Sequence, residues 1–261
     1  MTSTDAIGQN FVDHVLSIFV QPEVQKRIAE GTLVAPVPLN KVQVILHLDG
    51  PPVVRLNDEV SAVAQIVYAG GRPLAPGAPI YESDVGSVVW VQPGSDIDPN
   101  CGHIFILRIG TTFHAAFDFV YNKHHATQFL EKAEQFLRAA RNARANGDFA
   151  VVIDTLFSAA ELTAKALLIT NPFGSPLLEK ATHRGVQSRF GLWAKWGNVG
   201  TDHRDTFNAL ARMRDSARYD SVIPPSGNVD KWIADVDALK ESVTRLVERP
   251  RPPVPQNEGG A

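Results

Sequence analysis

Cysteine is nearly absent from this sequence, whose 261 residues contain one, Cys101. A single cysteine excludes an intrachain disulfide and a zinc site built from several cysteines, and it fits a reducing compartment. No run of residues is long enough, and free enough of charge and proline, to cross a membrane. The first residues, MTSTDAIGQN, lack the basic start and apolar run of a secretory signal. We therefore expect a cytoplasmic protein that does not contact a membrane.

The motifs of the common enzyme classes are also missing. The sequence contains no P-loop, no dinucleotide glycine fingerprint, no nucleophile elbow and no His-Glu-x-x-His pair. Ordinary hydrolases, kinases and dehydrogenases are therefore not expected, and neither is a cofactor. The histidines and acidic residues show no clustered ligand spacing, so we expect no bound metal.

Charge is modest in amount and uneven in distribution. Charged residues make up 20% of the chain and the net charge is −3. Residues 1–121 contain 6 Lys and Arg against 12 Asp and Glu, whereas residues 122–248 contain 17 against 15. The first part would repel a polyanion, and the second could meet one. A pI near 6.2 is low for a strong nucleic-acid binder.

The first 121 residues begin as a helix and continue as strands. Apolar residues at helical spacing predict a helix over 10–30 that breaks in two at Gln21–Pro22 and stops at Gly31. Short runs of Val, Ile, Thr and aromatic residues then predict antiparallel strands over 41–48, 53–56, 60–68, 85–91, 103–109 and 112–120. They indicate an antiparallel β domain over 1–121, built as one sheet or as a sandwich.

From residue 122 onward the apolar pattern becomes helical. Helices are expected over 122–146, 149–169 and 182–196, in the segment that carries Arg214, and after Asn228. Gly191 should interrupt the third helix, and Pro224-Pro225 should end the fourth. The pattern predicts an up-and-down helical bundle over 122–248. The tail over 249–261, RPRPPVPQNEGGA, predicts a flexible, polyproline-like end. The whole chain is therefore expected to be α+β.

Polar residues interrupt two of these helices. Glu161 and Lys165 lie four apart in the most apolar helix, with Glu first, which favours a pair on one helix face. They form either a plain surface pair or part of a site. The preceding helix carries a basic stripe at a spacing of three, either a solvated face or a phosphate-binding one. The stripe consists of Arg138, Arg141 and Arg144.

Aromatic residues accompany positive charge at two places. Trp193 and Trp196 are expected to pack on the bundle, with stacking on a nucleic-acid base as the alternative. The segment over 207–220, FNALARMRDSARYD, ends in a basic and aromatic cluster formed by Arg212, Arg214, Arg218 and Tyr219. Charged groups on long helices can face one another across a bundle seam.

Residues 121–248 resemble the HEPN domain family. Three features carry the resemblance: an AxExxxKALL-like helix over 159–168, a His-Arg-Gly helix opening at His183, and an Arg-x-x-x-x-Tyr-Asp ending over 214–220. The resemblance implies a small helical bundle that is often dimeric. Many members act on RNA in bacterial defence, toxin–antitoxin or stress systems, and others only bind. The first 121 residues resemble no family that we recognise.

The sequence departs from the nuclease members of that family. They carry an Arg followed, after a short polar spacer, by a His, and here the spacer after Arg214 leads to Tyr219. In a nuclease Arg214 would clamp the phosphate, Tyr219 would orient or donate, and His183 would enter from the neighbouring helix. The alternative is a structural Arg214 that pairs with Glu161 or Asp215 to fix the packing of the bundle.

Two functions follow from these residues. The first is a non-catalytic module that dimerises through the Arg214 helix, while the acidic β domain binds a protein partner or a small ligand. The second is a metal-independent endoribonuclease, in which the ribose 2′-OH attacks the neighbouring phosphate. The missing histidine and the acidic first half of the chain favour the non-catalytic module. The residues proposed for binding are Glu161, Lys165, Arg138, Arg141, Arg144, Arg218 and Asp220.

Overall fold

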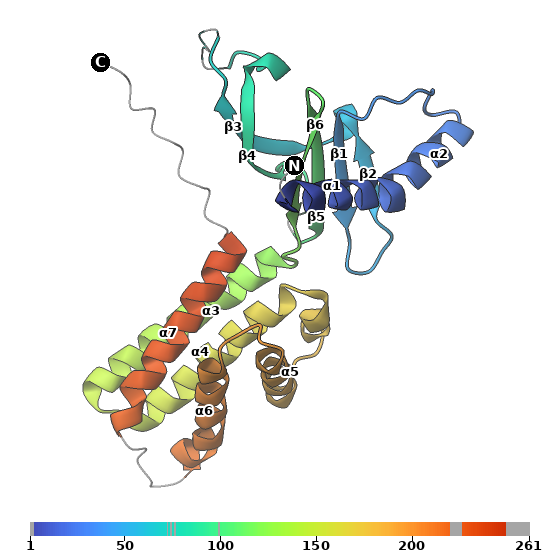
Figure 1. Ribbon diagram of the computed structural model, residues 1–261. Helices are drawn as coiled ribbons and strands as arrows, with labels where there is room; N and C mark the ends of the chain where they lie inside the picture. The colour runs from blue at the N-terminus through green and yellow to red at the C-terminus, as the bar shows by residue number, and fades with distance from the viewer. Residues whose placement is uncertain are drawn as a thin grey trace. The chain divides into compact units, whose positions relative to one another are not determined.

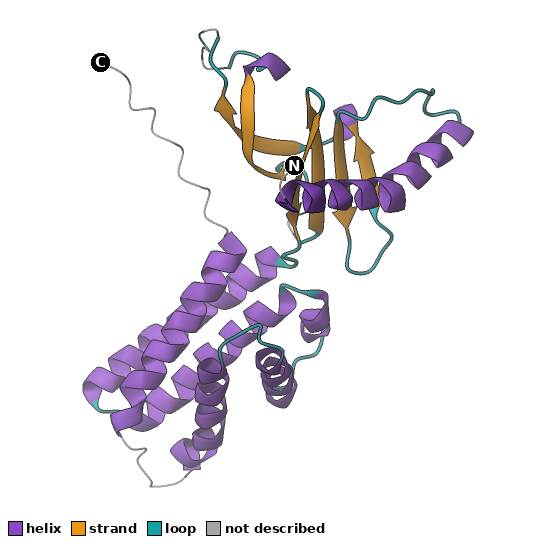
Figure 2. Cartoon of the chain, viewed as in Figure 1, coloured by secondary structure: helices purple, strands orange, loops and turns teal. Residues whose placement is uncertain are grey.

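The protein is an α+β chain, as its sequence predicts (Figures 1 and 2). The chain divides into two compact units. The computed structural model describes residues 3–71, 73, 75, 77–98, 100–219 and 226–248. The first unit lies within residues 1–119 and the second within 120–250. Three features expected from the sequence fall outside the described residues. They are Asp220, the end of the fourth helix at Pro224-Pro225 and the tail over 249–261.

The first unit opens with one continuous helical segment rather than two separate helices. Helix α1 (Ser3–Val15) runs through a π-helical turn (Leu16–Val20) into α2 (Gln21–Ala29). The prediction of a break at Gln21–Pro22 is therefore wrong. Pro22 lies in the first turn of α2, where a missing backbone N–H is tolerated, so the chain stays helical. Gly31, with a φ of 74°, follows the segment as expected.

The strands form two separate antiparallel sheets. A four-stranded sheet has the order β2-β1-β5-β6, and a second sheet pairs β3 with β4. Strand β1 pairs with β2 on one side and with β5 on the other. In this register Val44 lies opposite Val54 of β2 and opposite Ile104 of β5. The bounds of the strands are β1 Lys41–Leu46, β2 Val53–Leu56, β3 Ala62–Tyr68, β4 Val85–Pro93, β5 Gly102–Ile109 and β6 Thr112–Asp118.

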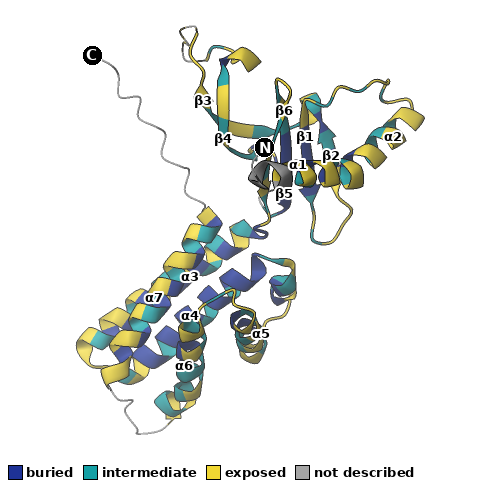
Figure 3. Ribbon diagram, viewed as in Figure 1, coloured by how far each residue is buried: buried dark blue, intermediate teal, exposed yellow. Residues whose placement is uncertain are grey.

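The larger sheet packs one face against the opening helix (Figure 1). Alternate strand residues point to that face because the side-chain period of a strand is two. The core that they form with α1 and the π-helical turn contains Val42, Val44, Val54, Leu56, Ile104, Ile106, Val12, Val15 and Val20. The other face of the two central strands is buried as well, at Gln43 and Phe105 (Figure 3).

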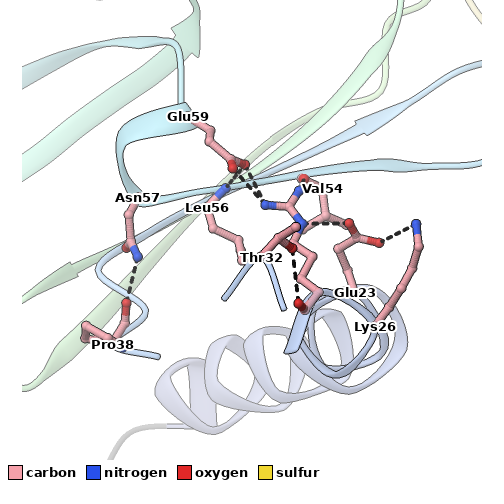
Figure 4. A network of polar contacts seen from close by, with 9 residues as sticks. Glu23, Lys26, Thr32, Pro38, Val54, Leu56, Asn57 and Glu59 are labelled. Carbon is pink, nitrogen blue, oxygen red and sulfur yellow. Dashed lines mark hydrogen bonds and ion pairs between the residues drawn. The ribbon is translucent and has the colours of Figure 1, made fainter. Parts of the chain in front are cut away.

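A polar network fastens α2 to the sheet (Figure 4). The Arg27 guanidinium donates to Glu23 at 2.7 Å, to both oxygens of Glu59 at 2.8 and 2.9 Å, and to the carbonyl of Val54 at 2.8 Å. These hydrogen bonds raise the pKa of Arg27 above its usual range. The Arg27 side chain is 19% exposed, and its bonds to Val54 of β2 and to Glu59, just after β2, give the helix a fixed place beside that strand.

The second unit is a helical bundle built around α4. Its helices are α3 Lys123–Asn146, α4 Phe149–Ile169, α5 His183–Lys195, α6 Thr201–Tyr219 and α7 Ser226–Glu248, with a 3-10 segment at Pro172–Leu177. Helix α4 contacts the other four and buries more than half of its residues (Figure 3). The expected interruption at Gly191 is wrong, since α5 runs through it. An open helical site accommodates a glycine at a modest cost in stability.

Candidate functional site

One face of α4 carries the polar groups that meet α5 and α6. Asp154, Phe157 and Glu161 lie three and four residues apart, so they share this face. Asp154 is the one charged residue in the apolar run over 149–160. A lone carboxylate in a packed helix needs a partner, and this was the signal that sequence reasoning missed.

Asp154 is the partner of two arginines of α6. The Nε of Arg214 donates to its Oδ1 at 3.0 Å, and the Nε of Arg218 donates to the same oxygen at 2.8 Å. The bond from Arg218 is the largest cause that lowers the pKa of Asp154, and the bond from Arg214 adds to it. The pairing of Arg214 with Glu161 or Asp215, which the sequence suggested for a structural arginine, is therefore wrong. Asp154, two helical turns before Glu161 on α4, takes that place.

Arg214 is also held from its apolar side. Its guanidinium carbon lies 4.6 Å from the centre of the Phe157 ring, in a cation–π arrangement. Phe157 packs in turn on Phe207 of the same helix as Arg214, with ring centroids 5.6 Å apart. The Arg214 side chain is 18% exposed. It is thus clamped between a carboxylate and an aromatic ring.

His183 approaches the other side of this face. Its Nδ1 donates to Oε1 of Glu161 at 2.5 Å, and its ring meets Phe157 edge-on with centroids 5.7 Å apart. The structure therefore brings His183 and Arg214 together around one phenylalanine. The predicted Glu161–Lys165 pair does not form, because Glu161 turns to His183. The ammonium of Lys165 lies 4.4 Å from the Phe129 ring centre, and burial lowers its pKa.

The remaining candidates on α6 are exposed. Arg218 is 41% exposed although it is bound to Asp154, and Tyr219 is 82% exposed. Tyr219 is the last residue of α6 and follows Arg218, which is bound to Asp154. Asp220 lies outside the described residues. The tyrosine that stands where nuclease members have a histidine is thus turned to solvent.

The basic stripe of α3 faces α7. Arg141 pairs with Asp237 at 2.8 Å, and Arg144 pairs with Asp230 at 2.9 Å. Lys240 adds a third pair to Glu134 at 2.5 Å. Arg138 lines an open groove of about 380 Å³ between the same two helices, which is also lined by Glu131 and Glu248. Carboxylates therefore neutralise much of the charge that the stripe would offer to a phosphate.

The β unit offers two polar places of its own. An open cavity of about 380 Å³ is lined by Asn40, Lys41, Glu82 and Arg108. Cys101 lies elsewhere, buried, with its sulfur 3.2 Å from Nδ1 of His47. Burial and the nearby Asp98 carboxylate raise the pKa of the Cys101 thiol to about 11, so this cysteine is a poor nucleophile at neutral pH.

The fold and this polar face define an antiparallel helical-bundle domain with cations gathered around a central helix. The family model of the HEPN domain matches residues 126–246, so the C-terminal unit is a HEPN domain and the predicted resemblance is confirmed. The N-terminal unit matches no family model. No curated protein matches the chain. Within the residues that the structure describes, no helix has the length and apolar character to cross a membrane.

Proposed function

We propose that this protein is a non-catalytic HEPN module that assembles as a homodimer and offers its β unit to a protein partner or small ligand. One observation carries the proposal. The two side chains that RNA cleavage would use are each bound to a carboxylate of α4, Arg214 to Asp154 and His183 to Glu161. Both pairs fix α5 and α6 to the central helix, which is a structural task.

RNA cleavage requires the arginine and an acid or base to be free to contact the substrate. The arginine must direct a free guanidinium edge at the phosphate, and an acid or base must lie within hydrogen-bond reach of the reacting oxygens. Arg214 gives its Nε to Asp154, is shielded by Phe157 and is 18% exposed. Tyr219, which stands where nuclease members have a histidine, is 82% exposed. The geometry thus favours assembly over catalysis.

The end of α6 is the surface that we assign to the dimer. Tyr219 is 82% exposed there, and Val151, one turn before Asp154 on α4, is 50% exposed. Arg218 lies between them on the shared carboxylate. Exposed aromatic and apolar side chains beside an arginine are typical of interface centres. A two-fold arrangement would bury both copies of this patch at once.

The β unit supplies the second surface. The two-stranded sheet leaves Val63 and Val67 of β3 and Val89 of β4 between 42% and 49% exposed. Neighbouring apolar side chains of this kind mark interaction sites more often than plain surface. The unit is acidic, with 12 Asp and Glu against 6 Lys and Arg over residues 1–121, which favours a basic or apolar partner.

A metal-independent endoribonuclease is the second candidate, and one observation favours it. His183 and Arg214 lie on either side of Phe157, at 5.7 and 4.6 Å from its centre. A histidine as acid or base and an arginine over the phosphate are the groups that this chemistry uses. His183 is 62% exposed, so it could turn from Glu161 toward a bound substrate.

A metal-free cleavage assay separates the two candidates. The purified protein is incubated with total tRNA and with a structured mRNA, beside Arg214→Ala and the matched variant Arg212→Ala, which removes an exposed arginine from the same helix. The assembly module predicts no cleavage by any of the three. Cleavage that persists in Arg212→Ala and disappears in a folded Arg214→Ala would establish the nuclease instead.

The dimer is tested by sedimentation velocity. Tyr219→Glu places a charge in the proposed interface and should convert the dimer to a monomer. Phe136→Glu, at an aromatic residue of α3 that is 39% exposed, is the matched control and should leave the dimer intact. A wild-type protein that sediments as a monomer at micromolar concentration, or a Tyr219→Glu variant that stays dimeric, would overturn this assignment.

A further inference from the structure

Helix α5 carries a second group of aromatic residues, separate from the face around Phe157. The ring of Phe173, from the 3-10 segment, stacks nearly parallel on Trp193, with centroids 6.0 Å apart and planes at 13°. Trp196 meets Phe173 edge-on at 5.0 Å and Trp193 at 6.1 Å. Trp193 packs on the bundle core, as expected, whereas Trp196 is 55% exposed. The cluster therefore holds one indole firmly at the surface.

Rigid support distinguishes this tryptophan from a mobile surface residue. The Arg189 guanidinium lies 5.0 Å from the Phe173 ring centre and donates to the Phe173 carbonyl at 2.6 Å. Arg189 and Trp193 lie four residues apart and share one side of α5, and Trp196 follows as the C-cap residue of that helix. The indole is thus fixed by two aromatic rings, and the ring beneath it is fixed by an arginine.

Basic residues outnumber acidic ones in the segment that carries this cluster, since residues 172–196 contain four Lys and Arg and one carboxylate, Glu179. Helix α5 contains three basic residues and no acidic one. In the part of the chain that the structure describes, none of the nearby basic residues forms an ion pair, in contrast to Arg141, Arg144, Arg214 and Arg218. The basic residues in question are Lys180, Arg184, Arg189 and Lys195. Lys195, which is exposed and next to Trp196 in the chain, has its charge available to an incoming anion.

We infer that the Phe173–Trp193–Trp196 cluster is a stacking platform for a single-stranded polynucleotide. Every base offers a π-face to a fixed indole, and unpaired cations beside it meet the phosphates, which are the two components of sequence-tolerant single-strand binding. Leu192, 43% exposed on the same helix, widens the apolar surface next to the indole. The inference does not depend on the proposed function, because it places binding away from Arg214.

The test measures tryptophan fluorescence of the full chain during titration with oligo(U) and oligo(dT), at two salt concentrations. Stacking on Trp196 should quench the signal, and affinity should fall as salt rises. Trp196→Ala should weaken binding about 5- to 100-fold, whereas Trp196→Phe, which keeps an aromatic ring, should lose much less. Phe136→Ala, which removes an aromatic side chain that is 39% exposed on α3, is the matched control and should bind within about twofold of the wild type.

Charge is tested separately with two exposed lysines. Lys195→Ala should weaken binding and reduce its dependence on salt, while Lys231→Ala, on α7, should do neither. No binding of either oligonucleotide, or full affinity in Trp196→Ala, would overturn the inference. Equal binding of poly-glutamate that is also lost in Trp196→Ala would assign the cluster to an acidic peptide instead, and would overturn the polynucleotide assignment.

Discussion

At the scale of single residues, Asp154 ties α6 to the central helix α4. It accepts hydrogen bonds from two arginines of another helix, and it is about one-third exposed. Asp154→Asn keeps the shape of the side chain and removes the charge, so we expect the free energy of unfolding to fall by about 1 kcal/mol after allowance for solvent screening. Urea denaturation measures this. Asp215→Asn, which changes an exposed aspartate of α6, should have no effect, and an equal loss in both variants would contradict the prediction.

The same carboxylate makes stability depend on pH. The pKa of Asp154 is lowered, chiefly by the hydrogen bond from Arg218. Its contribution is therefore fully present above its unfolded-state pKa of about 3.9 and is lost as the pH falls through the lower folded-state value. Urea midpoints of the wild type and Asp154→Asn should differ at pH 6, and the difference should begin to shrink as the pH falls below about 4. A difference that is the same at both pH values would show that the charge is not its cause.

Cys101 should be unreactive in the folded protein. Burial, with a smaller effect from Asp98, raises the pKa of its thiol to about 11, and the thiolate is the reactive form. Iodoacetamide at pH 8 should therefore alkylate the native protein far more slowly than the urea-unfolded chain. Asp98→Asn should speed the native reaction slightly. Rapid alkylation of the native wild type would contradict the prediction.

At the scale of elements, the connection between α4 and α5 depends on one glycine. A Cβ placed on Gly174 would lie 2.0 Å from the carbonyl oxygen of Leu168, which is backbone and cannot move aside. Gly174→Ala should therefore destabilise the protein by about 3 kcal/mol, the upper end of the cost of overpacking. Gly191→Ala is the counterpart in α5, where a Cβ would meet nothing within 4 Å.

The two glycine variants should move stability in opposite directions. Gly191→Ala should raise the free energy of unfolding by about 0.5–1 kcal/mol, because alanine loses less backbone entropy in a helix. Thermal unfolding followed by circular dichroism at 222 nm compares them directly. A Gly174→Ala variant as stable as the wild type would mean that the 3-10 segment can relax away from α4.

At the scale of the whole molecule, each unit has its own core. The hydrophobic cluster of the bundle and that of the β unit share no residue. We therefore predict that residues 120–248 fold without the first unit, with the helical circular dichroism and cooperative unfolding of a packed domain. A fragment that stays unfolded, or that melts without cooperativity, would show that the bundle needs the β unit.

Much of this architecture follows from the sequence by itself. Period-two runs bounded by Gly, Pro, Asn and Asp located the strands β1 to β6 of the described residues, and the apolar spacing located α3, α4 and α5 to within a residue or so. These patterns are local, since each residue meets neighbours two to four positions away. The HEPN resemblance also rests on local patterns, because each of its sequence features lies on a single helix.

Tertiary structure decided which charged groups meet. Arg214 could pair with several carboxylates from sequence alone, and the packing of α6 on α4 selected Asp154, sixty positions earlier in the chain. In the packed bundle Glu161 accepts a hydrogen bond from His183 and does not pair with Lys165. Arg141 and Arg144 of the α3 stripe pair with aspartates of α7. The packing also left Trp196 exposed on a supported surface. Long side chains choose partners by distance in space and by the loss of water around them, and a one-dimensional pattern contains neither quantity.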